Sequence, residues 1–455
     1  MKSYASRVRT FGMLHDLEEQ LKIETFRAIS LAVETPLMPN LQSLLWYGRD
    51  DAHFPYITLF LGAPQLTRIY INFSGTPSRL SLAPKLKALH HRIKNATLAY
   101  GTSLTEIEAV SALVCSWNSL TTLRCGPLTA EAWVHLSALP ALHSLSITIP
   151  PIELSGITFP IPFPFPTLQR LTVRLPNPNM LMPHIIMRLN EVAPISLKGL
   201  MIFLPTEFAS ADIKELFECL RKNTRQLQEL VIQRYPPRGS HSQGPTIKSD
   251  MLRPLFSLTK LVKISLNAKC SFNLDDMTLS QMAPSWPSLR ELNLGAEHGW
   301  KRRSKLRLKS LLIILAHCPD LQELGIVVDA GVDLNSMRKP GGGFSHATLR
   351  VLHMGDSRVK SAALVAAFLS DVVPCVTIIN AWQTSEMETR EGGKKYQRRW
   401  QEVKRLLSTF VMVREQERHW SEQTNASGLR SSMPLSETSS DSDDESSDDS
   451  SDSGP

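Results

Sequence analysis

The side chains of this chain that could hold a metal or attack a substrate are scattered along the sequence. Of the 13 histidines only His90 and His91 are adjacent, and neighbours on a strand face opposite sides. The cysteines form no CxxC pair, and no HxxxH pattern follows them at the spacing of a zinc site. The sequence therefore predicts no metal site, no cofactor and six free thiols, which are Cys115, Cys125, Cys219, Cys270, Cys318 and Cys375.

Two further patterns fall short of a catalytic or nucleotide-binding site. The chain contains no GxSxG segment, which would place a serine nucleophile on a strand-to-helix turn. The glycine-rich PGGGFSH at 340–346 lacks the Lys-Ser/Thr pair and the strand-loop-helix context of a phosphate-binding loop. These residues predict no enzyme, although a Ser, a His and an Asp that meet only in space would leave no mark in the sequence.

Charge is divided unevenly along the chain. The formal net charge is +7, but residues 436–455 hold eight acidic and no basic side chains, which leaves +15 on the first 435 residues. A basic body can attract polyanions through counterion release, or its charge can simply keep it soluble. Nucleic acid is not the expected partner because no nucleic-acid-binding motif is present. The run KRRSKLRLK at 301–309 fits a nuclear-import signal or anion patch, and equally a solvated segment that begins a helix.

Hydropathy and cysteine usage indicate the compartment. No apolar run follows the charged start MKSYASRVRT, and no window reaches the roughly 18 apolar residues that a membrane helix needs. Scattered cysteines fit a reducing environment. We therefore expect a cytoplasmic or nuclear protein without a membrane partner.

One sequence pattern recurs along the first 435 residues and must determine their architecture. It reads L-x-x-L-x-L, with Ile, Val or Met tolerated, and clear copies are PTLQRLTV at 166–173 and PSLRELNL at 287–294. The mean interval is about 28 residues, within the range of leucine-rich repeats. Twelve copies occur roughly in step, and their first apolar positions are Leu41, Leu66, Ile93, Leu120, Leu142, Leu168, Leu197, Leu227, Leu261, Leu289, Leu321 and Leu349.

The spacing within and between copies predicts a strand followed by a helix. The last two apolar positions of each copy are two residues apart, so they point to one side of a short strand. Between copies the apolar period becomes helical, as at 129–139, 210–223 and 308–318, and Ser103 with Glu106 has the spacing of a capping box. Stacking such units in parallel buries a face that one unit cannot cover. We predict an α/β leucine-rich-repeat solenoid of about twelve irregular repeats, with a curved parallel sheet on the concave side and helices on the convex side.

Four segments follow from these patterns. The apolar period before the first repeat suits a helix that closes the sheet edge, and VVPCVTIINAW at 372–382 has the pattern of a final strand. The helical stripe after it would pack on the array or dock a partner. The last segment cannot bury enough surface to fold, and its serines suit acid-directed kinases or a plain solubilising tail. The segments are an N-terminal helical cap at 1–38, the repeat array at 39–385, a C-terminal amphipathic helix at 386–423 and a disordered acidic Ser-rich tail at 424–455.

Three stretches carry a family resemblance: YASRVRTF at 4–11, the irregular PxLxxLxL repeats, and WQEVKRLLSTFVMVREQE at 400–417. Together they resemble the F-box and leucine-rich-repeat proteins abundant in mushroom-forming fungi. In that family the F-box binds a Skp-type adaptor of a cullin ubiquitin ligase, and the repeats select the substrate. The F-box that should precede 4–11 is missing here, so a Skp-type adaptor is expected only if an F-box exists upstream. LPTEFASADIKELFECL at 204–220 opens like an F-box, but a connecting loop and helix explains it better.

Side chains between the buried positions of each strand should face the concave surface, which repeat arrays commonly use for binding. Basic side chains beside apolar ones have the composition of a hot spot for an acidic protein, although a solvated face can have it too. We therefore predict a protein-binding repeat module, either the substrate-recognition part of an F-box-type ligase receptor or a stand-alone scaffold for an acidic protein or polyanion. The concave positions expected to contact the partner are Arg68, Tyr70, Arg124, Arg170, Arg174, Met201 and Phe203, with Glu229, Lys263, Glu291, Glu323 and His353 further along.

Overall fold

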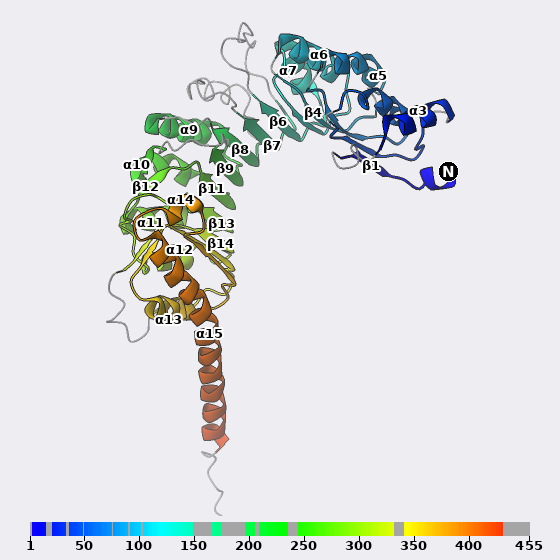
Figure 1. The fold of residues 1–455 in the computed structure, drawn as a ribbon. Coiled ribbons are helices and arrows are strands. Elements are labelled where there is room, and N and C mark those ends of the chain that lie inside the picture. Colours follow the sequence, from blue (N-terminus) through cyan, green and yellow to red (C-terminus); the bar gives the residue numbers. More distant parts are fainter. Residues whose placement is uncertain are drawn as a thin grey trace, which may run out of the picture.

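Short parallel strands line the inner side of an arch, and helices cover its outer side (Figure 1). The computed structural model describes residues 2–14, 21–32, 36–48, 50–74, 76–89, 92–101, 103–148, 165–174, 196–204, 209–234, 244–331 and 341–430. Some expectations concern residues outside these ranges, namely those on His90, His91 and most of the acidic tail.

The large sheet keeps the order of the sequence, because each strand pairs in parallel with the next repeat. This topology confirms the predicted leucine-rich-repeat solenoid, since all twelve predicted copies and the predicted final strand take part. The fourteen strands in the described part are β1 (Thr10–Met13), β2 (Ser43–Trp46), β3 (Arg68–Asn72), β4 (Asn95–Ala99), β5 (Thr122–Cys125), β6 (Ser144–Thr148), β7 (Arg170–Arg174), β8 (Gly199–Leu204), β9 (Glu229–Arg234), β11 (Lys263–Asn267), β13 (Glu291–Asn293), β14 (Glu323–Gly325), β16 (Val351–Gly355) and β18 (Ile378–Ala381).

Two small parallel ladders lie beside the large sheet. One pairs β10 (Thr246–Lys248) with β12 (Ser271–Asn273), and the other pairs β15 (Asp329–Ala330) with β17 (Arg358–Val359). The second ladder follows the carboxyl ends of β14 and β16, which places it next to the polar cluster described below.

Most connections return through a helix or a 3-10 turn. The helices predicted at 129–139, 210–223 and 308–318 are present, and the Ser103 capping box forms at the start of its helix. The described helices are α1 (Lys2–Ala5), α3 (Ile23–Ala32), α4 (Thr58–Leu61), α5 (Ala83–Lys87), α6 (Leu104–Val114), α7 (Ala130–Ala138), α9 (Ser210–Asn223), α10 (Ser249–Leu252), α11 (Asp276–Met282), α12 (Ser310–His317), α13 (Ala362–Val372), α14 (Ser385–Glu388) and α15 (Gly393–Arg430); the 3-10 helices are η1 (Phe54–Ile57), η2 (Pro77–Leu82), η4 (Arg253–Ser257) and η5 (Ala283–Ser285).

The repeated aliphatic positions form one continuous core between the sheet and the helices. The parallel register aligns Ile264 with Leu292 and then with Leu324, so each side chain packs on its counterpart in the next repeat. All three are buried. Burial of such a side chain contributes roughly 1.5–3 kcal/mol, and it is available only when a neighbouring repeat covers it.

The N-terminal segment differs from the helical cap expected at 1–38. Helix α3 does cover part of this end and buries Phe26, but β1 adds a strand to the sheet before the first predicted repeat. Met13 pairs with Trp46, and both side chains are buried. The strand was missed because Phe11, which pairs with Leu44, stands where the predicted copies have an aliphatic residue.

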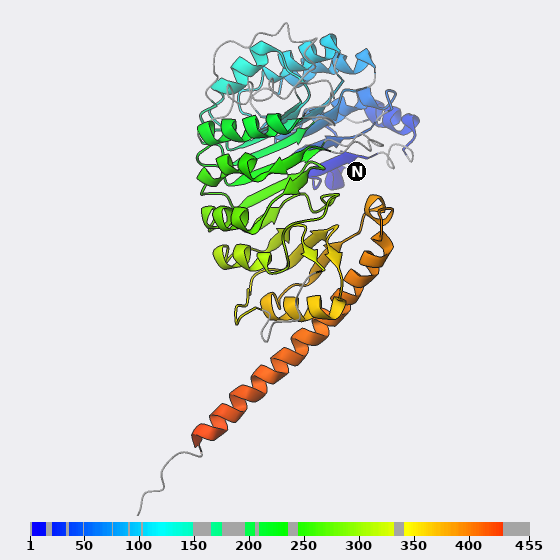
Figure 2. The same ribbon diagram turned by 90° about the vertical axis from the view of Figure 1, so that its left-hand side faces the viewer.

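The C-terminal helix also differs in its limits from the one expected at 386–423. The short helix α14 comes first, and Gly392, with φ +71°, turns the chain before α15 begins. Helix α15 then runs to Arg430, past the expected start of the tail (Figure 2). Its buried side chains, Trp400, Val403 and Leu407, belong to the predicted apolar stripe, and the helix packs on α13. No described helix has an apolar stretch that could cross a bilayer.

Candidate functional site

Side chains that the strands turn away from the core form continuous rows across the sheet. Parallel register fixes the rows, because partner residues in adjacent strands point to the same side. One row contains Arg68, Asn95, Thr122, Ser144, Arg170, Gly199 and Glu229; the next contains Tyr70, Thr97, Arg124, Ser146, Thr172 and Met201; a third contains Thr148, Arg174 and Phe203. Every predicted contact residue therefore lies on the concave face, in one of three neighbouring rows.

Four of the predicted residues come together on β7 and β8. The Arg174 guanidinium lies over the Phe203 ring, 5.3 Å from its centroid, and donates a hydrogen bond to the Ser146 hydroxyl at 2.7 Å. The Arg170 stem lies against Gly199, where an added Cβ would be 3.3 Å from its Cγ. Met201 and Phe203 are half-buried, whereas Arg170 is exposed. Arg170, Arg174, Met201 and Phe203 form what we call the β7–β8 patch.

The other predicted contact residues lie outside this patch. Arg68 and Tyr70 lie on β3, four strands from β7, which at the usual strand spacing is about 19 Å. The Tyr70 ring packs against Tyr47 instead, with centroids 4.1 Å apart. Arg124 lies between the two groups, about 10 Å from β7. Sequence spacing gave the correct face but not the distances along it.

The concave face changes its charge after β8. Further along the rows, Lys263 forms an ion pair with Glu291. Glu323 accepts from His353 Nε2 at 3.1 Å, and the Asn380 amide lies 3.2 Å from His353 Nδ1. On the concave face, exposed positive charge therefore concentrates in the first half of the array.

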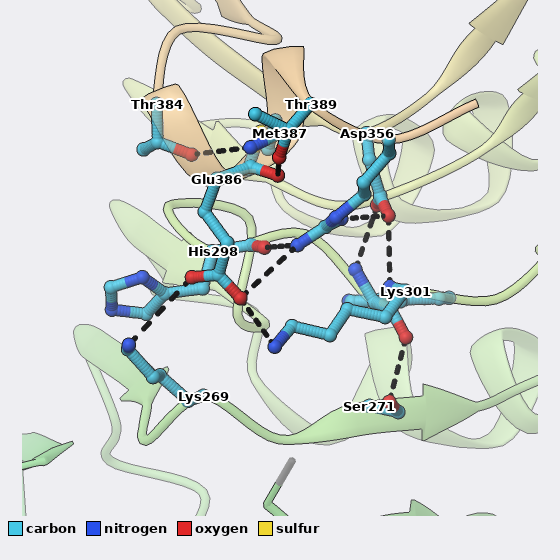
Figure 3. Close-up of polar contacts among 11 residues, drawn as sticks. Lys269, Ser271, His298, Lys301, Asp356, Thr384, Glu386, Met387 and Thr389 are labelled. Carbon is cyan, nitrogen blue, oxygen red and sulfur yellow. Dashed lines mark hydrogen bonds and ion pairs between the residues drawn. The ribbon is translucent and has the colours of Figure 1, made fainter. Parts of the chain in front are cut away.

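Sequence reasoning missed a polar cluster at the carboxyl ends of β11 to β18 (Figure 3). At its centre the buried Asp356 carboxylate accepts three hydrogen bonds. The donors are the backbone N–H groups of Trp300 at 2.7 Å and Lys301 at 2.8 Å, and Arg390 Nη1 at 2.6 Å. Arg390 Nη2 also donates to the His298 carbonyl at 3.0 Å. Gly299, with φ +67°, must be a glycine, because a Cβ there would lie 2.5 Å from Asp356.

Glu386 on α14 completes the cluster. Its carboxylate lies 2.5 Å from Lys301 Nζ and 3.7 Å from Lys269 Nζ (Figure 3). The hydrogen bond from Lys301 holds the pKa of Glu386 below its usual value. Burial lowers the pKa of His298, and nearby Lys269 lowers it further. We call this cluster the clasp; its members are Lys269, His298, Lys301, Asp356, Glu386 and Arg390.

Backbone strain in the described residues is concentrated at the clasp. The non-glycine residues with positive φ there are Lys269 and Lys301, both at 56°, and Trp382 at 53°. Strained residues persist only where surrounding contacts hold them, and they often mark functional sites. Contacts that join residues up to 92 positions apart leave no local signal in a sequence, so only the fold reveals the cluster.

A pocket of about 290 Å³ opens beside the clasp, and its lining includes Lys301, Arg302, Arg358, Asp356 and Trp382. Within the described ranges, no three His, Cys, Asp or Glu side chains gather as metal ligands would. The six cysteines are free thiols. The molecule thus presents two polar surfaces, the concave face and the pocket at the clasp.

Comparisons with known proteins show similarity in fold only. The sequence matches no protein-family model and no curated protein. Among solved structures, an internalin from Listeria monocytogenes is 14% identical with a TM-score of 0.43, over 76% of this chain and 81% of that one. TLR13, from its complex with ssRNA13, is 14% identical with a TM-score of 0.43, over 83% of this chain and 54% of that one.

A third similar structure is that of the Rad7 and Elc1 complex of yeast, 14% identical with a TM-score of 0.39, over 84% of this chain and 78% of that one. Likenesses this distant carry no argument about function. The assignment of the fold to the leucine-rich-repeat class stands on the strand pairing of the chain itself: fourteen parallel strands in the described part, paired in sequence order.

Proposed function

We propose that this chain is a protein-binding repeat module that takes an acidic protein on its concave face, chiefly through the β7–β8 patch. The observation that carries the proposal is the packing of Arg174 on Phe203 beside the exposed Arg170. An arginine already held by an aromatic ring loses little side-chain entropy when a partner binds. Half-buried apolar surface beside such cations is typical of binding hot spots.

The face is tested by photo-cross-linking from defined positions. A photoreactive amino acid replaces Arg170 in one variant and Lys87 in a matched control; Lys87 is exposed on α5, on the outer side of the arch. Position 170 should cross-link an acidic protein in cells, and position 87 should not. Equal cross-linking from both positions would remove the concave face as the binding site.

Charge reversal tests the same face by affinity. Arg124→Glu with Arg170→Glu should weaken binding of the cross-linked partner by about tenfold or more, because like charges then meet. Lys85→Glu with Lys87→Glu changes the net charge equally on α5 and should leave affinity within about twofold. Circular dichroism should be unchanged in both, since all four side chains are exposed. Equal loss in both variants would mean that only net charge matters.

The finer proposal is that the array serves as the substrate-recognition part of an F-box-type ubiquitin-ligase receptor. The resemblance at 4–11 and 400–417 supports it. The F-box-like opening at 204 does not, because the residues that follow form α9, a connecting helix between β8 and β9 with Leu216 and Phe217 in the core. Affinity capture from cells should recover a Skp-type adaptor and a cullin. Capture of the substrate without either would leave the alternative, a stand-alone scaffold for an acidic protein or polyanion.

A further inference from the structure

The basic run at 301–309 consists of bends, a β-bridge at Arg307 and a turn at 308–309, and it leads directly into helix α12. Its side chains alternate in burial: Leu306 and Leu308 are in the core, whereas Arg303, Lys305, Arg307 and Lys309 are exposed. Helix α12 starts only after the run, at Ser310. We call these four exposed side chains the basic comb.

The pocket beside the clasp lies at the start of the comb. Within its lining, Lys301, Arg303 and Arg390 pair with acidic side chains: Lys301 with Glu386, Arg303 with Asp329, and Arg390 with Asp356. Arg302 and Arg358 are exposed and have no ion-pair partner among the described residues. Arg302 and Arg358 therefore remain available, beside one further lining carboxylate, Glu391, in a hollow of about 290 Å³ that has room for a tetrahedral anion.

The comb and the pocket are joined by the small ladder. The backbone of Arg307 forms an isolated parallel β-bridge with the backbone of Asp329. Asp329 in turn pairs with Arg358 in the small ladder. The Asp329 carboxylate is occupied by Arg303 at 2.6 Å and by the Gly331 N–H at 2.9 Å. The ladder thus sets Arg307 and Arg358 on either side of a neutralised carboxylate, in a fixed backbone geometry.

This surface lies at one edge of the large sheet. Residues 327–329, Arg358 and Trp382 follow the carboxyl ends of β14, β16 and β18, so the parallel stacking of the strands brings them together. The strained backbone at Lys301 and Trp382 lines the same pocket and is held by the clasp. The site is preformed rather than assembled by exposed, flexible side chains alone.

We propose that the pocket binds the phosphoryl group of a phosphoserine peptide, while acidic residues of the same peptide lie along the basic comb. Arg302 and Arg358 supply the guanidinium groups, which bind phosphate oxygens in pairs. A phosphoserine carries close to two negative charges at neutral pH and gives three acceptor oxygens. This surface is separate from the concave face, so the inference does not depend on the proposed function.

A peptide fits this surface better than a nucleic acid. Proteins that hold single strands stack the bases on exposed aromatic rings. In the described part of the chain the exposed aromatic side chains are Tyr4, Tyr47 and Trp420, none of which lines the pocket or belongs to the comb. Trp382 lines the pocket but is itself buried. The site therefore offers charge and hydrogen bonds without a surface for bases.

The sequence contains one segment of this chemistry, the acidic Ser-rich stretch at 436–455, in which Ser442 precedes Glu445 by three residues. The described part of the chain ends at Arg430, at the far end of α15 from the pocket. From Tyr396, which stacks on Trp382, to Arg430 the helix rises about 51 Å. A coil of 20 residues spans only about 25 Å on average. The tail of a second copy, or a similar segment of another protein, is therefore the expected ligand.

The experiment measures fluorescence anisotropy of a labelled peptide of residues 436–455 with the full chain. The peptide is made with and without phosphate on Ser442. We expect the phosphopeptide to bind about tenfold more tightly than its unphosphorylated form, and Arg302→Glu with Arg358→Glu to abolish the difference. Lys85→Glu with Lys87→Glu, the control of equal charge, should bind as the wild type does. Equal phosphopeptide affinity in the wild type and the Arg302/Arg358 variant would overturn the proposal.

Two further arms separate the alternatives. A 20-base-pair DNA duplex that binds more tightly than the phosphopeptide, and is lost in the Arg302/Arg358 variant, would also overturn the proposal by showing a nucleic-acid surface. Sedimentation of the full chain after phosphorylation by an acid-directed kinase identifies the source. Self-association that Arg302→Glu with Arg358→Glu abolishes would assign a second copy, whereas a monomer that binds the free phosphopeptide would assign another protein.

Discussion

At the scale of single residues, burial decides what the titratable side chains can do. Three thiols show it most clearly: burial raises the pKa of Cys125, Cys270 and Cys318 to about 12 in each case. A thiol reacts as its thiolate, so these side chains act as small apolar groups in the core. Sequence analysis expected free thiols, but only the fold separates accessible from inaccessible ones.

Thiol labelling should therefore divide the cysteines into two groups. With a maleimide at pH 8 we expect Cys115 and Cys375, which are partly exposed, to react first, and the buried four to stay protected. Raising the pH to 10 should not label Cys125, Cys270 or Cys318, because their thiolates form only near pH 12. Mass spectrometry locates the labels, and urea-unfolded protein, in which all six should react, is the control. Early labelling of Cys318 would contradict the predicted packing of its repeat.

The clasp should weaken as the pH falls. The pKa of His298 lies below its usual 6.5, so protonation favours the unfolded state and stability declines as the pH drops below 6.5. The pKa of Glu386 lies below its usual 4.5, so its contribution is present above that pH and is lost below it. Urea unfolding followed by tryptophan fluorescence should show both declines, and His298→Gln should remove the first. A His298→Gln profile identical to the wild type between pH 6.5 and 5 would exclude His298 as the cause.

At the scale of elements, each repeat contributes one strand whose aliphatic side chains have no cover until a neighbour stacks on them. Leu292 on β13 illustrates this, because it lies between Ile264 and Leu324 in adjacent strands and is 1% exposed. The helices behind the sheet vary in length and kind, from the 3-10 turn η4 to the long α9. The register between strands is therefore the same from repeat to repeat, whereas the length and type of the helix that returns the chain can vary.

Truncating one side chain of this core tests the register. Leu292→Ala should lower the free energy of unfolding by about 2 to 5 kcal/mol, since it removes buried apolar contacts and leaves a cavity. Thr172→Ala, on the concave side of β7, should change it by no more than about 0.5 kcal/mol. Urea denaturation measures both. A neutral Leu292→Ala would show that this position does not belong to the core.

At the scale of the whole molecule, stability in a repeat array is a sum of local terms, because each repeat touches only its neighbours. The clasp departs from this rule. Arg390, between α14 and α15, bonds to the His298 carbonyl 92 residues earlier, and thereby joins the C-terminal helices to the loop after β13. We infer that the clasp stabilises the last repeats as one unit, while the first repeats depend on their own contacts.

Loss of the central carboxylate should loosen one end of the arch only. Asp356→Ala leaves Arg390 Nη1 and two backbone N–H groups without their acceptor, so hydrogen exchange should accelerate by about tenfold or more in β16, β18 and α14. Strands β2 to β5 should exchange as in the wild type. Mass spectrometry of peptic fragments reads both regions. Uniform acceleration along the chain would show that the array unfolds as a single cooperative unit.

The sequence by itself determined the class of fold and the face of each strand. The spacing of aliphatic residues is a local feature that repeats in every unit. A pattern such as that of Leu289, Leu292 and Leu294 therefore indicates a strand wherever it recurs in the sequence. The same spacing placed Arg170 and Phe203 on the concave side, since alternation along a strand is a property of the backbone. The spacing of residues in the sequence could not predict distances across the sheet, and Arg68 lies several strands away from the β7–β8 patch.

The tertiary structure alone decided where polar groups from different repeats meet. Asp356, Glu386 and Lys301 carry no shared motif, and each follows a different strand or begins a different helix. Parallel stacking brings the carboxyl ends of those strands to one edge, and this is the physical reason why the clasp and its basic pocket exist. The same stacking places the leucines of the run at 301–309 in the core and leaves its cations exposed.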